Sequence, residues 1–210
     1  MMRNGIRKIL PAVALLWATG AMSQDDLPIP SDELVYCTVC HGVQLMGNPI
    51  IRAPRLSGMD SWYVEQQLRN FSAGVRGLHE DDTIGVDMQP MAAVLTDEQI
   101  KEAAVFVNAT RSTYPEITIS GDALKGKAHY STCAACHGVA GKGNEALGSP
   151  DLTIPDDWYL VTQLQNFKSG ARGSHPADSY GMQMRASVQL LPDDEAIMDV
   201  VSYISTLRND

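Results

Sequence analysis

Several features are scarce in this chain of 210 residues, and each absence excludes a class of function. Lysine and arginine number 16 against 25 aspartates and glutamates. The resulting charge of −9 argues against nucleic-acid binding, which selects basic surfaces. No Ser/His/Asp set for nucleophilic catalysis and no phosphate-binding loop is visible. Strand patterns are weak throughout, so the sequence predicts an all-α fold.

A run of apolar residues long enough to span a membrane is also missing near the N-terminus. The run from Ile9 to Ala18 is shorter than the roughly 20 residues that cross a bilayer. Three basic residues precede it and small residues follow it as far as Ser23, which is typical of a secretory signal. We expect residues 1–23 to be removed, which leaves a charge of −12 and no stable transmembrane anchor. An uncleaved anchor is the alternative.

The chain has only four cysteines, and all of them lie in one five-residue pattern that occurs twice. The two copies are Cys37-Thr38-Val39-Cys40-His41 and Cys133-Ala134-Ala135-Cys136-His137. C-x-x-C-H is the attachment signal of a c-type haem, in which the two thiols bond to the haem vinyl groups. The adjacent histidine, His41 or His137, then becomes the proximal iron ligand. The sequence therefore predicts two covalently bound haem c groups.

Three other uses of these cysteines are possible. A zinc site built from both C-x-x-C pairs would join pairs 96 residues apart, too far for an ordinary zinc ribbon. Redox dithiols of the thioredoxin kind require a βαβ context, which the sequence does not indicate. Structural disulfides are the third use. We favour haem because both copies carry the histidine and together consume every cysteine.

An internal repeat extends well beyond the two motifs. A shift of 96 residues superposes Pro on Pro, Trp-Tyr on Trp-Tyr, Gln-Leu on Gln-Leu and Arg-Gly on Arg-Gly. We therefore expect a domain at 24–112, a linker at 113–119 and a second domain at 120–210. A unit of this size has difficulty burying a core of its own, and a covalent haem supplies apolar bulk.

Each unit is predicted to contain helices joined by long loops. The first helix carries the motif at its end. Ser120 or Asp122 can cap it in the second unit, and prolines delay its start to about Ser31 in the first. A middle helix begins near Asp60 or Asp156 and ends near a glycine, Gly74 or Gly170. The last helix begins at the capping-box pattern Thr96-Asp97-Glu98-Gln99, or at Pro192-Asp193.

A second iron ligand opposite each histidine is expected to be methionine, whose soft sulfur favours reduced iron. Only Met88 and Met184 coincide in the repeat, and we place both on loops between the middle and last helices. Met91 and Met182 are the fallback ligands. Two further histidines, at positions 79 and 175, also coincide, so ligation by two histidines is an alternative, although their polar surroundings favour a surface turn.

Other coinciding residues have predicted supporting roles. The carbonyls of Pro54 and Pro150 are placed to accept a hydrogen bond from the proximal imidazole, which would fix its orientation. The Trp-Tyr pairs are expected to line the haem cleft or to pack in the core. Arg76 and Arg172 are expected either to pair with haem propionates or to lie exposed in solvent.

These residues together resemble the class I cytochromes c, and most closely the dihaem cytochrome c4 family. The resemblance covers nearly all of the chain after residue 23. It rests on the paired motifs, Pro-x-Leu at Pro54 and Pro150, Tyr-x-x-x-Gln-Leu at Tyr63 and Tyr159, Met-x-x-Met-x-x-x-Leu-Thr-Asp at Met88, and Met182-Gln-Met184-Arg185. Two departures are a short first helix and a first loop, Gly42 to Met46, that is poor in glycine.

The resemblance implies two tandem cytochrome c domains, each with a His/Met haem. They are expected to carry electrons in the periplasm from respiratory donors to a redox partner such as a respiratory complex or a terminal oxidase. Loose association with the membrane is compatible with this function. Two six-coordinate haems leave no open iron site, so the protein is expected to be a carrier and not an enzyme. The alternatives are a dihaem peroxidase, a thiosulfate-oxidising dehydrogenase, and a haem subunit bound permanently to a dehydrogenase or oxidase. The acidic charge favours a partner with a basic docking face, or serves solubility alone.

Overall fold

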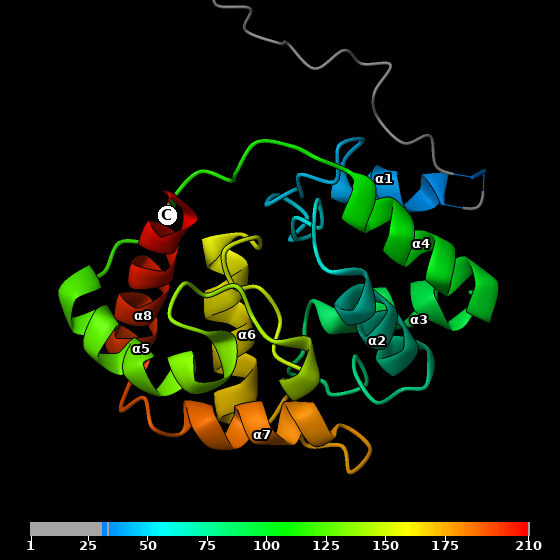
Figure 1. Cartoon of the computed structure of the whole chain (residues 1–210). Coiled ribbons are helices and arrows are strands. Elements are labelled where there is room, and N and C mark those ends of the chain that lie inside the picture. Colours follow the sequence, from blue (N-terminus) through cyan, green and yellow to red (C-terminus); the bar gives the residue numbers. More distant parts are fainter. Residues whose placement is uncertain (1–30, 33, 210) are drawn as a thin grey trace, which may run out of the picture.

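The computed structural model describes residues 31–32 and 34–209. The predicted signal, residues 1–23, lies outside the described residues. Two groups of helices follow one another along the chain, and an extended segment joins them (Figure 1). The first group contains α1 (Val35–His41), α2 (Ser61–Ser72), α3 (Gly85–Ala93) and α4 (Asp97–Ala109). The second contains α5 (Ala123–His137), η2 (Glu145–Leu147), α6 (Asp157–Ser169), α7 (Ser179–Val188), α8 (Asp194–Thr206) and η3 (Leu207–Asn209).

The described residues form helices and two isolated β-bridges, which confirms the all-α prediction. In each unit the last helix packs on the middle helix, α4 on α2 and α8 on α6, and α8 also packs along α5. Each unit has its own cluster of buried apolar side chains. Among the described residues, none of the helices is long and apolar enough to cross a membrane.

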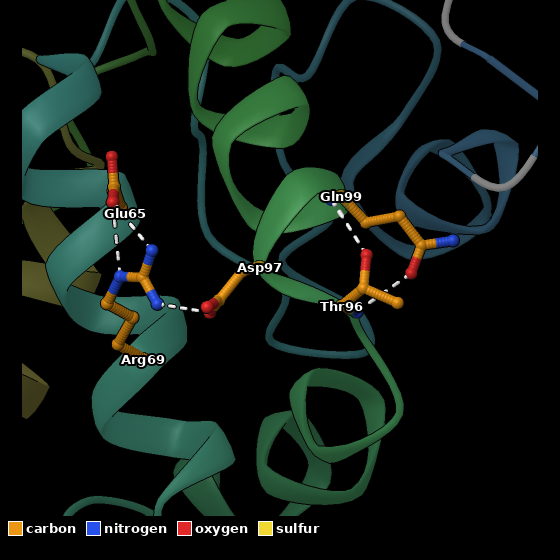
Figure 2. Close-up of polar contacts among 5 residues, drawn as sticks. All are labelled: Glu65, Arg69, Thr96, Asp97 and Gln99. Carbon is orange, nitrogen blue, oxygen red and sulfur yellow. Dashed lines mark hydrogen bonds and ion pairs between the residues drawn. The ribbon is translucent and has the colours of Figure 1, made fainter.

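The last helix of the first unit begins as predicted, with a complete capping box. The backbone N–H of Gln99 donates to the Thr96 hydroxyl at 3.2 Å, and the Gln99 side chain accepts from the Thr96 N–H at 2.9 Å. Arg69 on α2 bonds both Glu65 and Asp97, at 2.9 and 2.5 Å, so that α2 is tied to the start of α4. Figure 2 shows both sets of contacts.

The helix ends predicted in the second unit are also confirmed. Asp122 accepts from two backbone N–H groups at the start of α5, and Asp193 accepts from the N–H of Ala196 at the start of α8. Gly170 ends α6 in the left-handed conformation that glycine adopts at little cost. In the first unit α2 ends slightly earlier, at Ser72, and Gly74 has the positive φ.

Helix α1 is shorter than predicted. It begins at Val35 and not at about Ser31, and the residue before it, Leu34, provides no side-chain cap. Leu34 instead is 2% exposed and packs in the core of the first unit. Burial of this side chain, with no polar cap to extend the helix, explains the later start.

The segments that hold Met88 and Met184 are helices, so the prediction that both residues lie on loops is wrong. Met88 lies within α3 and Met184 within α7. Each helix starts at an Asp-x-x-Gly signal, in which an aspartate, Asp82 or Asp178, accepts from the glycine N–H three residues later. Hydrophobic periodicity did not predict these helices, because α3 contains Pro90 and α7 is mostly polar.

At one position of the first loop, Leu45 stands where the second unit has a glycine, and a second substitution compensates for its size. Leu45 has φ 53° where the repeat places Gly141 with φ 71°, and a left-handed leucine costs about 1–2 kcal/mol. Leu45 is completely buried together with Leu34, and burial of such a side chain contributes about 1.5–3 kcal/mol. In the second unit the equivalent of Leu34 is the larger Tyr130, whose hydroxyl lies 3.5 Å from the position of a Cβ on Gly141. Leu34 and Leu45 in the first unit therefore fill the space that Tyr130 occupies beside Gly141 in the second.

The segment between the units is fastened from both sides. Arg55 in the first unit donates to the Ser112 and Thr113 carbonyls, and Arg208 in the second donates to the Pro115 carbonyl. Asp157, which is fully buried at the start of α6, accepts from both the backbone and the hydroxyl of Thr118 and from the N–H of Ile119. The linker is thus bonded to the domains along most of its length.

Replacing Asp157 with asparagine is expected to lower the free energy of unfolding by about 1–3 kcal/mol at neutral pH, because buried donors lose a charged acceptor. Burial opposes ionisation of Asp157, but its hydrogen bonds outweigh burial and hold its pKa below the usual range. This contribution is complete above the unfolded pKa of about 3.9 and is lost as pH falls through the folded value. Urea unfolding of both proteins from pH 7 to pH 3 should show the difference shrinking. Asp194→Asn, at an exposed position on α8, is the control.

Candidate functional site

Each C-x-x-C-H motif forms the C-terminal end of a helix, α1 or α5. This places both thiols and the histidine within two turns of one another. His41 and His137 are buried, at 5% and 7% exposure. All four thiols are free, with Cys37 and Cys133 packed against the core of their units and Cys40 and Cys136 exposed.

Each buried histidine has a defined orientation. The Nδ1 atom of His41 lies 2.7 Å from the Pro54 carbonyl oxygen, and that of His137 lies 2.9 Å from the Pro150 carbonyl oxygen. A carbonyl oxygen only accepts, so Nδ1 carries the proton and Nε2 keeps a free lone pair. Burial lowers the pKa of both imidazoles, which favours this neutral form. The predicted role of the two proline carbonyls is confirmed.

The alternatives to haem attachment lose support from this arrangement. No cysteine in the described residues is paired in a disulfide. Among the described residues, no group of three or more histidine, cysteine, aspartate or glutamate side chains is placed to hold a metal ion. The motifs lie at helix ends in a helical protein, and the described residues form no βαβ unit.

A cavity of about 280 Å³ lies beside the second motif. Cys133, Cys136 and His137 line it on one side, and Met184 of α7 lines it as well. The interior wall is apolar and comes from α6 and α8, with Leu160, Leu164, Phe167, Val200 and Ile204. The cavity thus brings all four ligand and attachment residues predicted for the second unit into one place.

The structure separates the preferred methionines from their fallbacks. Met184 is half-buried and packs against the core of its unit, whereas Met182 is 42% exposed. Met88 is likewise half-buried on α3, and Met91 is 48% exposed. In each helix the methionine that coincides in the repeat is therefore the less exposed of the two.

The two further histidines lie on surface turns. His79 and His175 are both exposed, and the Nδ1 of each accepts from a backbone N–H two residues later, at Asp81 or Ala177. This geometry matches the surface-turn interpretation and gives no support to ligation by two histidines.

Arg76 and Arg172 are buried and lie between the two units, so the alternative in which they are exposed to solvent is wrong, and pairing with haem propionates stays a prediction. Their exposed fractions are 7% and 8%. Arg76 of the first unit donates to the Tyr159 hydroxyl at 2.9 Å and to the Gln163 side-chain oxygen at 3.0 Å, both in the second unit. Its guanidinium also lies over the ring of Phe71, 4.4 Å from the centroid.

Arg172 makes the mirror-image contacts in the opposite direction. It donates to Gln67 at 2.8 Å and to the Tyr63 hydroxyl at 3.3 Å, both in the first unit. Burial opposes ionisation of Tyr63, but the guanidinium charges of Arg172 and Arg76 outweigh burial and lower its pKa. Sequence reasoning did not identify Gln67 and Gln163 as functional, although their coincidence in the repeat was a signal.

Several buried donors at this boundary have no partner among the described residues. They are Nε of Arg76, Nε of Arg172 and the side-chain amide nitrogen of Gln163. Arg172 and Gln163 also line the cavity beside His137. An apolar cavity with a histidine lone pair inside and buried cationic donors at its edge fits a haem, whose ring is apolar and whose propionates are anionic.

Comparison with known proteins agrees with this geometry. The cytochrome c family model matches residues 34–111 and 123–208. A thiosulfate dehydrogenase electron acceptor from Stutzerimonas stutzeri is 33% identical over 182 residues, covering 81% of this chain and 78% of that protein. The crystal structure of cytochrome c4 from Pseudomonas stutzeri superposes with a TM-score of 0.65 at 26% identity, covering 82% of this chain and 93% of that one. A thiosulfate dehydrogenase structure from Marichromatium purpuratum gives a TM-score of 0.61 at 27% identity, covering 81% of this chain and 36% of that one.

Proposed function

The chain belongs to the cytochrome c family, and from this membership we propose which residues hold its two covalently bound haem c groups. Cys37 and Cys40 attach the first haem, and Cys133 and Cys136 attach the second. His41 with Met88, and His137 with Met184, would hold the two irons. The domains extend over 24–112 and 120–210, with 113–119 as the linker.

The observation that carries this assignment is the second-unit cavity. His137 and Met184 both face it, the attachment cysteines line it, and Nε2 of His137 has a free lone pair. The first unit repeats the same hydrogen bond between His41 and Pro54 and the same half-buried methionine on its third helix. The two units are therefore assigned the same ligand set.

The protein is a dihaem electron-transfer protein. When bound, each haem supplies a one-electron iron couple. The residues of the chain keep water from the iron, hold the proximal imidazole in one orientation, and provide soft sulfur on the other side. Two protein ligands at each iron leave no position for a substrate, which favours a carrier over a dihaem enzyme.

We place the protein in the periplasm, where it accepts electrons from a partner enzyme and passes them to an acceptor such as a terminal oxidase. The similarity to thiosulfate dehydrogenase electron acceptors supports a thiosulfate dehydrogenase as the donor. A permanent subunit of a dehydrogenase or oxidase would use the same residues and differs only in co-purifying as an intact complex.

The test is rapid-mixing spectroscopy of the oxidised protein. A purified thiosulfate dehydrogenase with thiosulfate should reduce both haems, and thiosulfate alone should not. Reduction by thiosulfate alone, or catalytic turnover of peroxide, would show an enzyme. If ascorbate reduces both haems but the dehydrogenase does not, the carrier function stands and the proposed donor is wrong.

A further inference from the structure

The two units differ on the surface around their motifs, although they share one fold. Seven exposed apolar residues surround the first motif: Val35, Tyr36, Val39, Val43, Met46, Ile50 and Ile51. A shift of 96 residues places Ser131, Thr132, Ala135, Lys142 and Ala146 at five of these positions. Three of these five residues are polar or charged and two are alanine, so only Val139 and Leu147 keep a large apolar side chain in the second unit. We call the seven residues of the first unit the apolar face.

The side chains of the apolar face are strongly exposed. Ile50 is 90% exposed, Val43 75%, Val39 71% and Tyr36 67%. Single exposed apolar residues are ordinary, but seven within 17 consecutive residues are a concentration that calls for an explanation, because contiguous exposed apolar patches mark interaction sites. The equivalent surface of the second unit shows that the fold does not require these residues.

The apolar face also lacks charge. Between residues 34 and 54, Arg52 is the only arginine, lysine, aspartate or glutamate, although the whole chain carries a charge of −9. The charged surfaces of an acidic protein attract a basic partner. The apolar face would instead bind a partner through the removal of its apolar side chains from water. Association through it should therefore depend little on salt.

The apolar face lies at the electron-transfer site of the first unit. Val39 stands inside the motif next to exposed Cys40, and Val43 follows His41 by two residues. A partner that covers these side chains would also cover Cys40, which would attach the first haem.

We propose that the first unit, through its apolar face, is the docking site for a redox partner protein that presents an uncharged, apolar surface around its own redox centre. A single electron passes from the partner's reduced centre, which is thereby oxidised, to the ferric iron of the first unit, and no covalent bond changes. The second unit, with its more polar surface, exchanges electrons elsewhere. This inference rests on the proposed carrier function.

The experiment replaces three residues of the apolar face with the residues that the second unit has at the same positions. The haem-loaded variant Tyr36→Thr, Val39→Ala, Ile50→Ala carries the side chains that the second unit tolerates at the same positions. The matched control is Val105→Ala, Leu124→Ala, which removes two exposed apolar side chains outside both motifs, 64% and 84% exposed. Two probes are used: reduction by thiosulfate dehydrogenase with thiosulfate, and electron exchange with a gold electrode coated with a methyl-terminated alkanethiol.

We expect the triple variant to lose at least tenfold in electron-exchange rate at the methyl-terminated electrode, and in second-order reduction rate by the dehydrogenase, with little dependence on sodium chloride. The control should match the wild type. An unchanged triple variant, or an equal loss in the control, overturns the proposal. Sedimentation showing a wild-type dimer that the triple variant breaks, or binding to phosphatidylcholine vesicles that it abolishes, assigns the face to another occupant and also overturns it.

The two proposals fail in different ways. If the wild type exchanges electrons at the electrode but receives none from the dehydrogenase, the donor is wrong and the electrode comparison still decides the docking face. If ascorbate reduces neither haem, the carrier function itself fails.

Discussion

Replacing Met184 with alanine will convert the second haem from low-spin to high-spin and lower its potential. Met184 is the half-buried methionine of α7 and faces the same cavity as His137. Loss of its sulfur opens the sixth position at the iron and removes a ligand that favours the reduced state. We expect a decrease of at least about 60 mV, which corresponds to a tenfold change in a one-electron equilibrium.

Visible spectra of the oxidised protein and a redox titration measure this change, and Met182→Ala is the control. Met182 is exposed and two residues away, so its loss should change neither spin state nor potential. A fully low-spin Met184→Ala protein with an unshifted potential would show that the ligand is wrongly assigned. Met88→Ala, with Met91→Ala as its control, applies the same comparison to the first haem.

Replacing both Cys133 and Cys136 with alanine will give a chain that carries one covalent haem fewer. These are the cysteines of the second motif, and the two cysteines of the first lie in a separate unit with its own core. Mass spectrometry of the denatured protein should show a chain one haem lighter, because no thiol remains to hold the second group.

The single haem that remains should belong to the first unit, and peptide mapping should find it on Cys37 and Cys40. The paired substitution Cys37→Ala, Cys40→Ala is the reciprocal control and should leave the haem on Cys133 and Cys136. A mass equal to that of the wild type in either variant would contradict attachment through these thiols.

Local signals in the sequence were sufficient for much of the fold. Thr96, Asp122 and Asp193 cap helices as predicted because a cap depends on groups within one turn. The carbonyls of Pro54 and Pro150 were found because a thirteen-residue spacing recurs in both units. A repeat can be used like an alignment within one chain. It is the reason why Met88 and Met184 are the predicted ligands in preference to neighbouring methionines.

The features that sequence reasoning missed depend on contacts between distant segments. Helices α3 and α7 have weak periodicity, and each is fixed by a buried aspartate at its start. The burial of Arg76 and Arg172 could not be predicted from one unit, because each arginine finds its acceptors in the other. An arginine in a polar stretch looks solvent-exposed until the partner domain is in place.

Arg76 and Arg172, each bonded to the opposite unit, also determine whether one unit keeps its structure when it is expressed alone. If the second unit were expressed alone, Arg172 would lose its acceptors Gln67 and Tyr63, while Tyr159 and Gln163 would lose the guanidinium that Arg76 supplies. Arg172 would keep Gln163 as an acceptor, but the N–H groups that bonded Gln67 and Tyr63 would need water, at the edge of the cavity that Arg172 lines. The two halves are therefore not independent, and the buried arginines hold them in one relative arrangement. Electron transfer between the two haems would then need no movement of one domain relative to the other.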